Sequence, residues 1–183
     1  MEVIQAIKER RSIRKYKPEP VSDEELNIVL EAARWAPSWA NTQCWRFIIV
    51  KDKTLKEKLR DTLTEWNPGR NAMIEAPIVI VACAELGKSG FRRGEKVTER
   101  EDWLMFDVAL ALQNLTLTAH SLGLGTLHIG AFDAKEAGKI VDVPDNVVVV
   151  ELMPVGYPDE HPDPRNRNEI KTFVYENRYG VSY

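Results

Sequence analysis

The sequence predicts an α+β domain in which helices flank one central sheet of four to five mixed or antiparallel strands. Two observations support this class. The expected helices and strands do not alternate one for one along the 183 residues, as they would in a doubly wound sheet. One segment, residues 101–122, is long and apolar enough for a helix buried at the centre of the domain. A chain of this length is typical of one domain, so we expect residues 1–183 to share one fold.

Capping and turn residues define the elements of the first half. Residues 2–9 are expected to form a short helix. Ser22 followed by Glu25 has the spacing of a capping box, which predicts a helix from there to about Ala36, where Pro37 stops it. Apolar runs predict buried strands over 45–50 and 78–83. Between them, Asp52 is expected to cap a helix that runs to about Trp66, and Pro68 and Gly69 end that element.

The second half begins with residues 86–100, which have no hydrophobic period and are expected to form a mobile excursion. The long helix follows over about 101–122, and Gly123 occupies the position that a left-handed C-cap favours. The remaining elements are a strand over 124–129, a helix capped by Asp133, a strand over 147–155, and a C-terminal arm over 157–183 in which 173–175 adds a short strand.

The long helix also predicts an oligomer. Its large apolar residues cover every face; they are Leu104, Phe106, Val108, Leu110, Leu112, Leu115, Leu117 and Leu122. A helix of this kind must be buried on all sides. A domain of this size has little room to enclose it, so part of its surface is expected to pack against a second copy in a homodimer.

Composition favours a cytoplasmic protein without nucleic-acid or membrane partners. The net charge of −3 gives no basic field for nucleic acid or anionic lipid. The N-terminus is charged too early for a signal peptide, and polar residues interrupt 103–122 as a membrane span. The two cysteines and three histidines lack metal-binding spacing, so we expect no metal. Neither the Gly-x-Ser-x-Gly motif of triad hydrolases nor a P-loop is present.

Two arginine clusters point to an anionic ligand. Residues 10–14 read Arg-Arg-Ser-Ile-Arg, and residues 165–167 read Arg-Asn-Arg. Guanidinium groups stay charged at cellular pH and present fixed pairs of N–H donors. Such clusters therefore suit a phosphate or a delocalised anion.

Four segments, taken in order, resemble the FMN-dependent nitroreductase family. They are Arg-x-Ser-x-Arg at 10–14, Pro-Ser-x-x-Asn-x-Gln-x-Trp at 37–45, Gly-Leu-Gly leading into a strand at 123–125, and Arg-x-Arg at 165–167. The resemblance implies a three-layer nitroreductase-like fold and a homodimer that binds FMN at the subunit interface. It also implies that residues 86–100 border the substrate site. Gly-x-Gly here follows a helix and precedes a strand, which is the reverse of a dinucleotide-binding fingerprint.

The resemblance assigns the phosphate end of FMN to the two arginine clusters. Arg10 and Ser12, with Arg11 beside them, are expected at the phosphate and ribityl chain. Arg14 is expected near N1 and O2 of the ring, where a cation stabilises the charge of reduced flavin. Arg165 and Arg167 are expected to close over the phosphate beside Arg10.

Two further segments are implied as flavin contacts. Pro37, Ser38, Asn41 and Gln43 are expected to reach FMN from the second subunit. The segment departs from the family pattern at Cys44, where the family has proline, and the thiol is expected to act as a small packing residue.

The strand after Gly-Leu-Gly is implied to lie along the ring. The backbone of Leu127, His128, Ile129 and Gly130 is expected against one face, with the amides of Ile129 and Gly130 directed at N5 and O4. A histidine at a strand end is more often packed than catalytic, so no side chain is assigned as a catalytic acid, base or nucleophile.

The resemblance therefore implies an oxidoreductase that takes hydride from NAD(P)H at flavin N5 and then reduces a nitroaromatic, a quinone or another electron-poor acceptor in a ping-pong cycle. Two alternatives remain open. One keeps the fold and FMN but destroys the flavin or removes halogen from an aromatic amino acid. The other is a non-enzymatic FMN-binding module.

Overall fold

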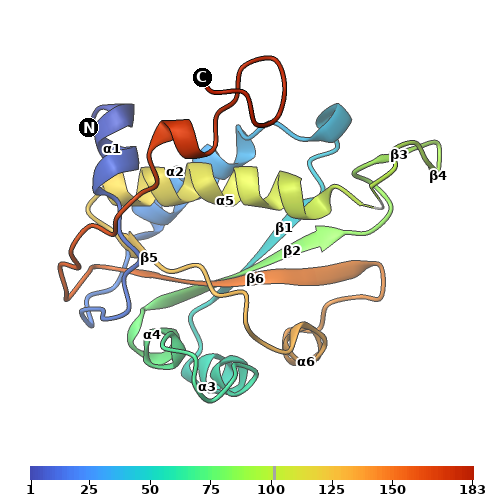
Figure 1. Ribbon diagram of the computed structural model, residues 1–183. Helices are drawn as coiled ribbons and strands as arrows, with labels where there is room; N and C mark the ends of the chain where they lie inside the picture. Colours follow the sequence, from blue (N-terminus) through green and yellow to red (C-terminus); the bar gives the residue numbers. More distant parts are fainter. Residues whose placement is uncertain (101) are drawn as a thin grey trace.

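The protein is built on a four-stranded antiparallel sheet, seen here in a computed structural model that describes residues 1–100 and 102–183 (Figure 1). The strands lie in the order β1, β2, β6, β5. Their bounds are Trp45–Val50 for β1, Ile78–Glu85 for β2, Gly125–Thr126 for β5 and Val147–Gly156 for β6. The expected sheet of four to five strands is confirmed.

The central strand β2 is apolar along almost its whole length, and its first seven residues are buried. A strand covered on both faces needs no polar alternation, which is why the sequence shows a continuous apolar run there. Its register with β6 shifts between Ala82 and Cys83, so the two strands pair through an irregularity near the middle of the sheet.

Helices cover both faces of the sheet (Figure 1). One core cluster joins residues of α2 and α5 to the sheet, for example Val29, Leu112 and Ile80. The other joins α3, α4 and α6 to the opposite face and includes Leu59 and Met73. The helix bounds are Val3–Glu9 for α1, Asp23–Arg34 for α2, Lys53–Asp61 for α3, Arg70–Glu75 for α4, Leu104–Ser121 for α5 and Ala134–Ile140 for α6. The fold therefore has three layers.

Two predicted helix starts are confirmed at the level of individual atoms. The Ser22 hydroxyl accepts a hydrogen bond from the Glu25 N–H, and the Glu25 carboxylate accepts one from the Ser22 N–H, which completes the capping box of α2. Asp52 caps α3 through the backbone of Leu55. Helix α3 nevertheless ends at Asp61 rather than near Trp66, because the chain turns toward α6. The Asp133 N–H then donates to the Thr62 carbonyl oxygen at 2.8 Å.

The long helix α5 is buried on one face only. Its inward residues recur at helical spacing; they are Leu104, Val108, Ala111, Leu112, Leu115 and Ala119. On its other side, Met105 is 61% exposed and Phe106 is 55% exposed. Incomplete burial within one chain agrees with the expectation that the domain is too small to enclose this helix. The second copy expected to cover the rest stays a prediction. The start expected at residue 101 falls on a position outside the described residues.

Residues 86–100 contain regular structure that the sequence did not predict. They contain a hairpin of β3 (Phe91–Arg92) and β4 (Glu95–Lys96), whose turn places Arg93 and Gly94 at positive φ. Two consecutive left-handed residues are typical of a tight hairpin turn. Strands of two residues are too short to show a hydrophobic period, so sequence patterning missed them.

Three short elements also differ from expectation. Helix α4 was not predicted, because its six residues follow the turn at Pro68 and Gly69 directly. Only Gly125–Thr126 of the expected strand over 124–129 joins the sheet as a strand. Residues 173–175 form no strand; the arm contains a 3-10 turn, η2 (Ile170–Thr172), and an isolated bridge between Tyr175 and Ser182.

Candidate functional site

The first arginine cluster lies on an extended segment that runs beside β5. Ser12 forms a parallel bridge with Thr126, and the Ile13 N–H donates to the Thr126 carbonyl oxygen at 3.0 Å. A Cβ at Gly125 would lie 2.6 Å from Ile13 Cγ1, so only glycine permits this approach. Because Ile13 is buried in the core, the side chains of its neighbours Ser12 and Arg14 lie on the other side of the extended chain, where they are available to a ligand.

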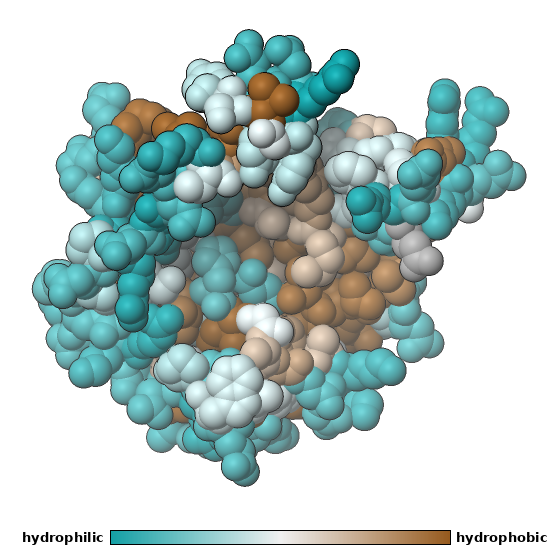
Figure 2. Space-filling view, in the orientation of Figure 1, coloured by the Kyte–Doolittle hydropathy of each residue, from teal (hydrophilic) through white to brown (hydrophobic). Residues whose placement is uncertain are grey.

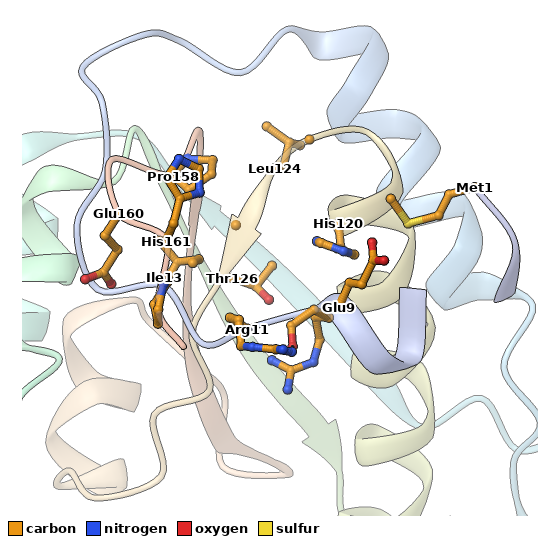
Figure 3. A pocket seen from close by; sticks show the side chains of 14 residues that line it. Met1, Glu9, Arg11, Ile13, His120, Leu124, Thr126, Pro158, Glu160 and His161 are labelled. Atoms are coloured by element: carbon orange, nitrogen blue, oxygen red, sulfur yellow. The ribbon is translucent and has the colours of Figure 1, made fainter. Parts of the chain in front are cut away.

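A cavity of about 450 Å³ opens beside this segment, between the end of α1, the end of α5 and the start of the C-terminal arm. In Figure 3, Glu9 and His120 lie on one side of it, Glu160 and His161 on the other, and Arg11 between them. Arg10 also lines this cavity. The structure therefore brings two of the predicted arginines to one concave site.

Guanidinium groups crowd together at this cavity, which Glu9 and Glu160 also line. Burial lowers the pKa of Arg10, and the neighbouring charges of Arg11 and Arg167 lower it further. The effect of Arg167 shows that the two ends of the sequence approach one another here. Arg167 also donates to the backbone carbonyl oxygen of Arg165 at 3.1 Å, and both side chains lie on the exposed arm. An anion would relieve the mutual repulsion of these guanidinium groups.

His120, which sequence analysis did not single out, lies in the same cavity. Its Nε2 atom is buried and has no hydrogen-bond partner among the described residues. Burial lowers the pKa of His120; Glu9 opposes this shift, while Arg10 and Arg11 add to it. A histidine near the end of an apolar helix carries no motif, so only its place in the fold identifies it.

A second, smaller cavity of about 170 Å³ lies on the other side of the same segment. It is lined by Arg14, by Leu127 to Ala131, and by Asn67, Pro68 and Gly69. The structure thus joins Arg14 to the predicted backbone segment 127–130. Residues 67–69 are new to the site, because the sequence marked them only as a helix terminator.

The loop at 67–69 is fixed against the backbone of 127–131. Asn67 accepts a hydrogen bond from the Gly69 N–H at 2.8 Å and donates one to the Ala131 carbonyl oxygen at 3.2 Å. A Cβ at Gly69 would lie 2.8 Å from Ile129 Cδ1, so glycine allows the two segments to approach closely. The cavity therefore has one wall held in place without a ligand.

The backbone of 127–130 departs from expectation at one amide. The Ile129 N–H donates to the Leu152 carbonyl oxygen in β6 at 3.1 Å, so it does not face a ligand. Among the described residues the Gly130 N–H has no hydrogen-bond acceptor, and a Cβ at Gly130 would meet open space. Of the two expected amides, that of Gly130 alone is free to meet a bound ring.

His128 is held by its own protein neighbours. Its Nδ1 lies 2.6 Å from Glu151 Oε1, and its Nε2 lies 3.1 Å from the Thr116 hydroxyl. Both ring nitrogens are therefore engaged between α5 and β6. This arrangement agrees with the expectation that His128 is packed rather than catalytic.

The segment after Pro37 forms a compact polar turn. The Gln43 N–H donates to the Ser38 hydroxyl at 3.0 Å, and the Gln43 side chain donates to Asn41 Oδ1 at 3.1 Å. Ala40, Asn41 and Gln43 all have positive φ, which non-glycine residues rarely adopt. Non-glycine residues in this region cluster at functional sites, because strain persists only where the surroundings enforce it.

Within one chain, this polar turn lies far from the cavity that Arg10 and Arg11 line, here called the arginine cavity. It is bonded to Asp107 in the first turn of α5, whereas the cavity includes His120 in the last turn. Thirteen residues of helix separate these positions by about 20 Å. Figure 1 shows the same separation, with α1 and β5 near one end of α5 and the β3–β4 hairpin near the other. The predicted ligand contacts therefore form two groups in each chain.

Cys44 is a packing residue in this structure. Its thiol is buried, and burial together with Asp107 raises its pKa to about 12. A neutral, enclosed thiol is a poor nucleophile and a poor metal ligand. In the described residues, no three His, Cys, Asp or Glu side chains gather in a way that could hold a metal ion. None of the described helices is long and apolar enough to cross a membrane.

Comparisons with known proteins place this geometry in a family context. The profile described as "Nitroreductase family" matches residues 7–73 and 62–157. A protein of Methanothermobacter thermautotrophicus with a provisional NADH dehydrogenase/NAD(P)H nitroreductase name is 33% identical over 170 residues, covering 91% of this chain and 82% of its own. An iodotyrosine deiodinase of Thermotoga neapolitana is 31% identical over 184 residues, covering 89% and 92%. The solved structure of an FMN-dependent nitroreductase from Clostridium difficile has a TM-score of 0.82 at 29% identity and covers 96% of this chain and 99% of that one.

The environment of His120 predicts a pH-dependent stability. Because its pKa is lowered from 6.5 in the folded protein, the unfolded chain binds the proton more readily. The free energy of unfolding should therefore fall as the pH drops from about 7.5 to about 5.5. His120→Gln should remove this part of the pH dependence in urea denaturation, and the exposed His161→Gln variant is the control. Parallel curves of unfolding free energy against pH for the parent and His120→Gln would contradict the lowered pKa of His120.

Proposed function

This chain belongs to the nitroreductase family, and we propose that it is an NAD(P)H-dependent oxidoreductase that binds FMN and reduces electron-poor acceptors. One observation carries the proposal. The arginine cavity lies at one end of segment 10–14, and the small cavity lined by Arg14 and residues 127–130 lies at the other. FMN has the same two parts, a phosphate and a planar ring, joined by a short chain.

The residues present fit this cofactor. The crowding of Arg10 with Arg11 and Arg167, and the His120 Nε2 that has no hydrogen-bond partner in the described residues, suit an anion, although Glu9 and Glu160 also line the cavity. Arg10, Arg11 and Arg167 would hold the phosphate, with Ser12 along the chain that follows it. Arg14 would place its charge beside the ring, and the Gly130 N–H would donate to it. When bound, FMN supplies the capacity to accept and return a hydride; the protein supplies position and charge.

We also propose that the working unit is a homodimer. Exposed apolar side chains gather on α1, on α5 and on the C-terminal arm; they include Val3, Ile4, Ile7, Met105, Phe106, Ile170 and Phe173. Figure 2 shows a recessed, largely apolar region below α5, bordered by hydrophilic side chains. Large exposed apolar surfaces favour association. A second copy would bring its Pro37, Ser38, Asn41 and Gln43 to the cavity from which they are separated within one chain.

The small cavity beside Arg14 suits donor and acceptor in turn. Both would have to approach the same open side of the ring, which implies a ping-pong order. Trp66 is 76% exposed and directly precedes Asn67 in the cavity wall. Its indole offers an electron-rich face on which a nitroaromatic or a quinone could stack.

The relative named as an iodotyrosine deiodinase supports one alternative, reductive dehalogenation on the same fold. The two chemistries differ in their products. Incubation of the reduced protein with a nitroaromatic, a quinone and a halogenated tyrosine in parallel, followed by product analysis, distinguishes them. Release of halide without nitro or quinone reduction would replace the proposal with the alternative.

The visible spectrum tests the proposed function directly. Purified protein, or protein mixed with FMN and freed of excess by gel filtration, should show flavin absorbance. NADH or NADPH under argon should bleach it, and a quinone should restore it. Absence of bound flavin would overturn the proposal. Bound flavin that neither nucleotide reduces would instead favour a non-enzymatic FMN-binding module.

Loss of a cavity arginine should weaken FMN binding. Arg10→Ala and Arg167→Ala each leave the phosphate less well paired, which should reduce affinity by about 10- to 150-fold. Titration followed by flavin fluorescence measures this change. Lys171→Ala removes a positive charge from the same arm, at a residue paired with Glu169, and should bind as the parent does. If all three variants bind FMN with the affinity of the parent, these two arginines do not belong to the phosphate site.

The β3–β4 hairpin should steer anionic substrates. Arg92 and Arg93 are exposed at its turn in a chain that is net acidic. Changing both to Gln should raise the KM for NADPH or an anionic acceptor, more strongly at low salt, while FMN binding stays intact. Lys53→Gln with Lys58→Gln on α3 is the matched control. Kinetics identical to the parent across a salt series would show that the hairpin charges have no steering role.

A further inference from the structure

Asp107 is a fully buried acidic side chain that connects two segments of the proposed site. It lies in the first turn of α5 and accepts hydrogen bonds through both carboxylate oxygens. The donors are the Trp39 N–H at 2.9 Å, the Ser89 hydroxyl at 2.7 Å, the Thr42 hydroxyl at 3.3 Å and, more weakly, the Cys44 thiol at 3.7 Å. No motif in the sequence identified it.

A buried carboxylate is expensive unless hydrogen bonds and charge compensate it. The partners described for Asp107 are all neutral groups, and no cation is among them. The amino end of α5 compensates part of the charge through the helix dipole. An apolar residue would fill this core position at lower cost. The hydrogen-bonding pattern therefore points to a positioning role.

The polar turn at 38–43 is what the carboxylate holds in place. Asp107 bonds Trp39 before the left-handed residues and Thr42 among them. Ala40 and Asn41, at φ of 45° and 56°, lie between these two anchors. Left-handed backbone is unfavourable for residues with a Cβ, so the turn depends on its anchors. Its geometry determines where Ser38, Asn41 and Gln43 point.

The same carboxylate reaches the base of the hairpin segment. Ser89 is buried, and its hydroxyl makes the shortest of the four contacts with Asp107. Its carbonyl oxygen also accepts from the Trp103 N–H at 3.3 Å, just before α5. Asp107 thus ties residues 38–44 and residue 89 to one point on a rigid helix.

We propose that Asp107 is a positioning residue for the cofactor: it fixes the turn at 38–43 in the conformation that contacts FMN across the dimer, and through Ser89 it couples the hairpin segment to that contact. The inference rests on the proposed function, since it assigns the turn to the FMN site. It predicts that Ser89, which lines neither cavity, influences FMN affinity.

Three variants test the proposal by FMN titration at temperatures well below unfolding. Asp107→Asn keeps the shape but replaces one acceptor by a donor, and it should weaken FMN binding by at least about 10-fold. Ser89→Ala removes one contact and should weaken it by about 3- to 10-fold. Asp145→Asn removes an exposed carboxylate from the loop before β6, away from the turn, and should leave affinity unchanged. Thermal unfolding of each apoprotein is measured in parallel.

The pattern of results decides the proposal. Unchanged FMN affinity in Asp107→Asn and Ser89→Ala, with or without a lower melting temperature, would show a purely structural role and overturn it. If Asp107→Asn does not fold, Ser89→Ala and Thr42→Val give the answer by the same criterion. Combining Ser89→Ala with Asn41→Ala should give less than the sum of the separate losses, because both act through one turn. A parent protein that binds no FMN would overturn the proposed function together with this inference, whereas normal binding by parent and variants alike overturns the inference alone.

Discussion

The length of helix α5 constrains every other part of this structure. One face of the helix packs on the sheet through residues such as Leu112 and Leu115, and this packing fixes its position. Its first turn carries Asp107 and holds the polar turn at 38–43, while its last turn carries His120 and borders the arginine cavity. Because a helix cannot shorten, the two groups of ligand contacts cannot meet within one chain. In the homodimer proposed above, a second copy would bring them together, and the exposed Met105 and Phe106 on the same helix would give that copy an apolar surface to cover.

The charge distribution follows from a second close approach, between segment 10–14 and β5. Gly125 allows the buried side chain of Ile13 to lie directly against the strand, which fixes the residues on either side of it. Arg10 and Arg11 then face one cavity and Arg14 the other. Burial, together with the nearby charges of Arg11 and Arg167, makes the positive charge of Arg10 costly, as its lowered pKa indicates. The phosphate of the proposed cofactor would recover part of that free energy.

The sequence was sufficient for features that depend on local physics. The capping box at Ser22, the Asp52 cap and the apolar runs of β1, β2 and β6 were predicted because each is encoded within a few neighbouring residues. Local patterns failed for α4 and for the β3–β4 hairpin, which are too short to show a period. The residues of the candidate site also divide into those that the sequence reveals locally and those that only the fold reveals. Arginine clusters are visible in the sequence, whereas Asn67, Gly69, His120 and Asp107 became visible only through proximity created by the fold. The expected Ile129 amide contact was wrong because pairing with Leu152 in β6 takes precedence.

The two kinds of site residue also differ in what they would contribute. The arginines act through charge and tolerate small displacements, since Coulomb interactions fall off slowly with distance. The Ser38, Asn41 and Gln43 side chains act through hydrogen bonds, which weaken steeply when their geometry changes. A group of the second kind needs a rigid support, and a strained turn on the protein surface cannot provide it alone. The buried carboxylate of Asp107 supplies that support from within the core. This explains why a costly buried acid lies behind the polar turn, whereas the arginine cavity is formed by partly exposed side chains.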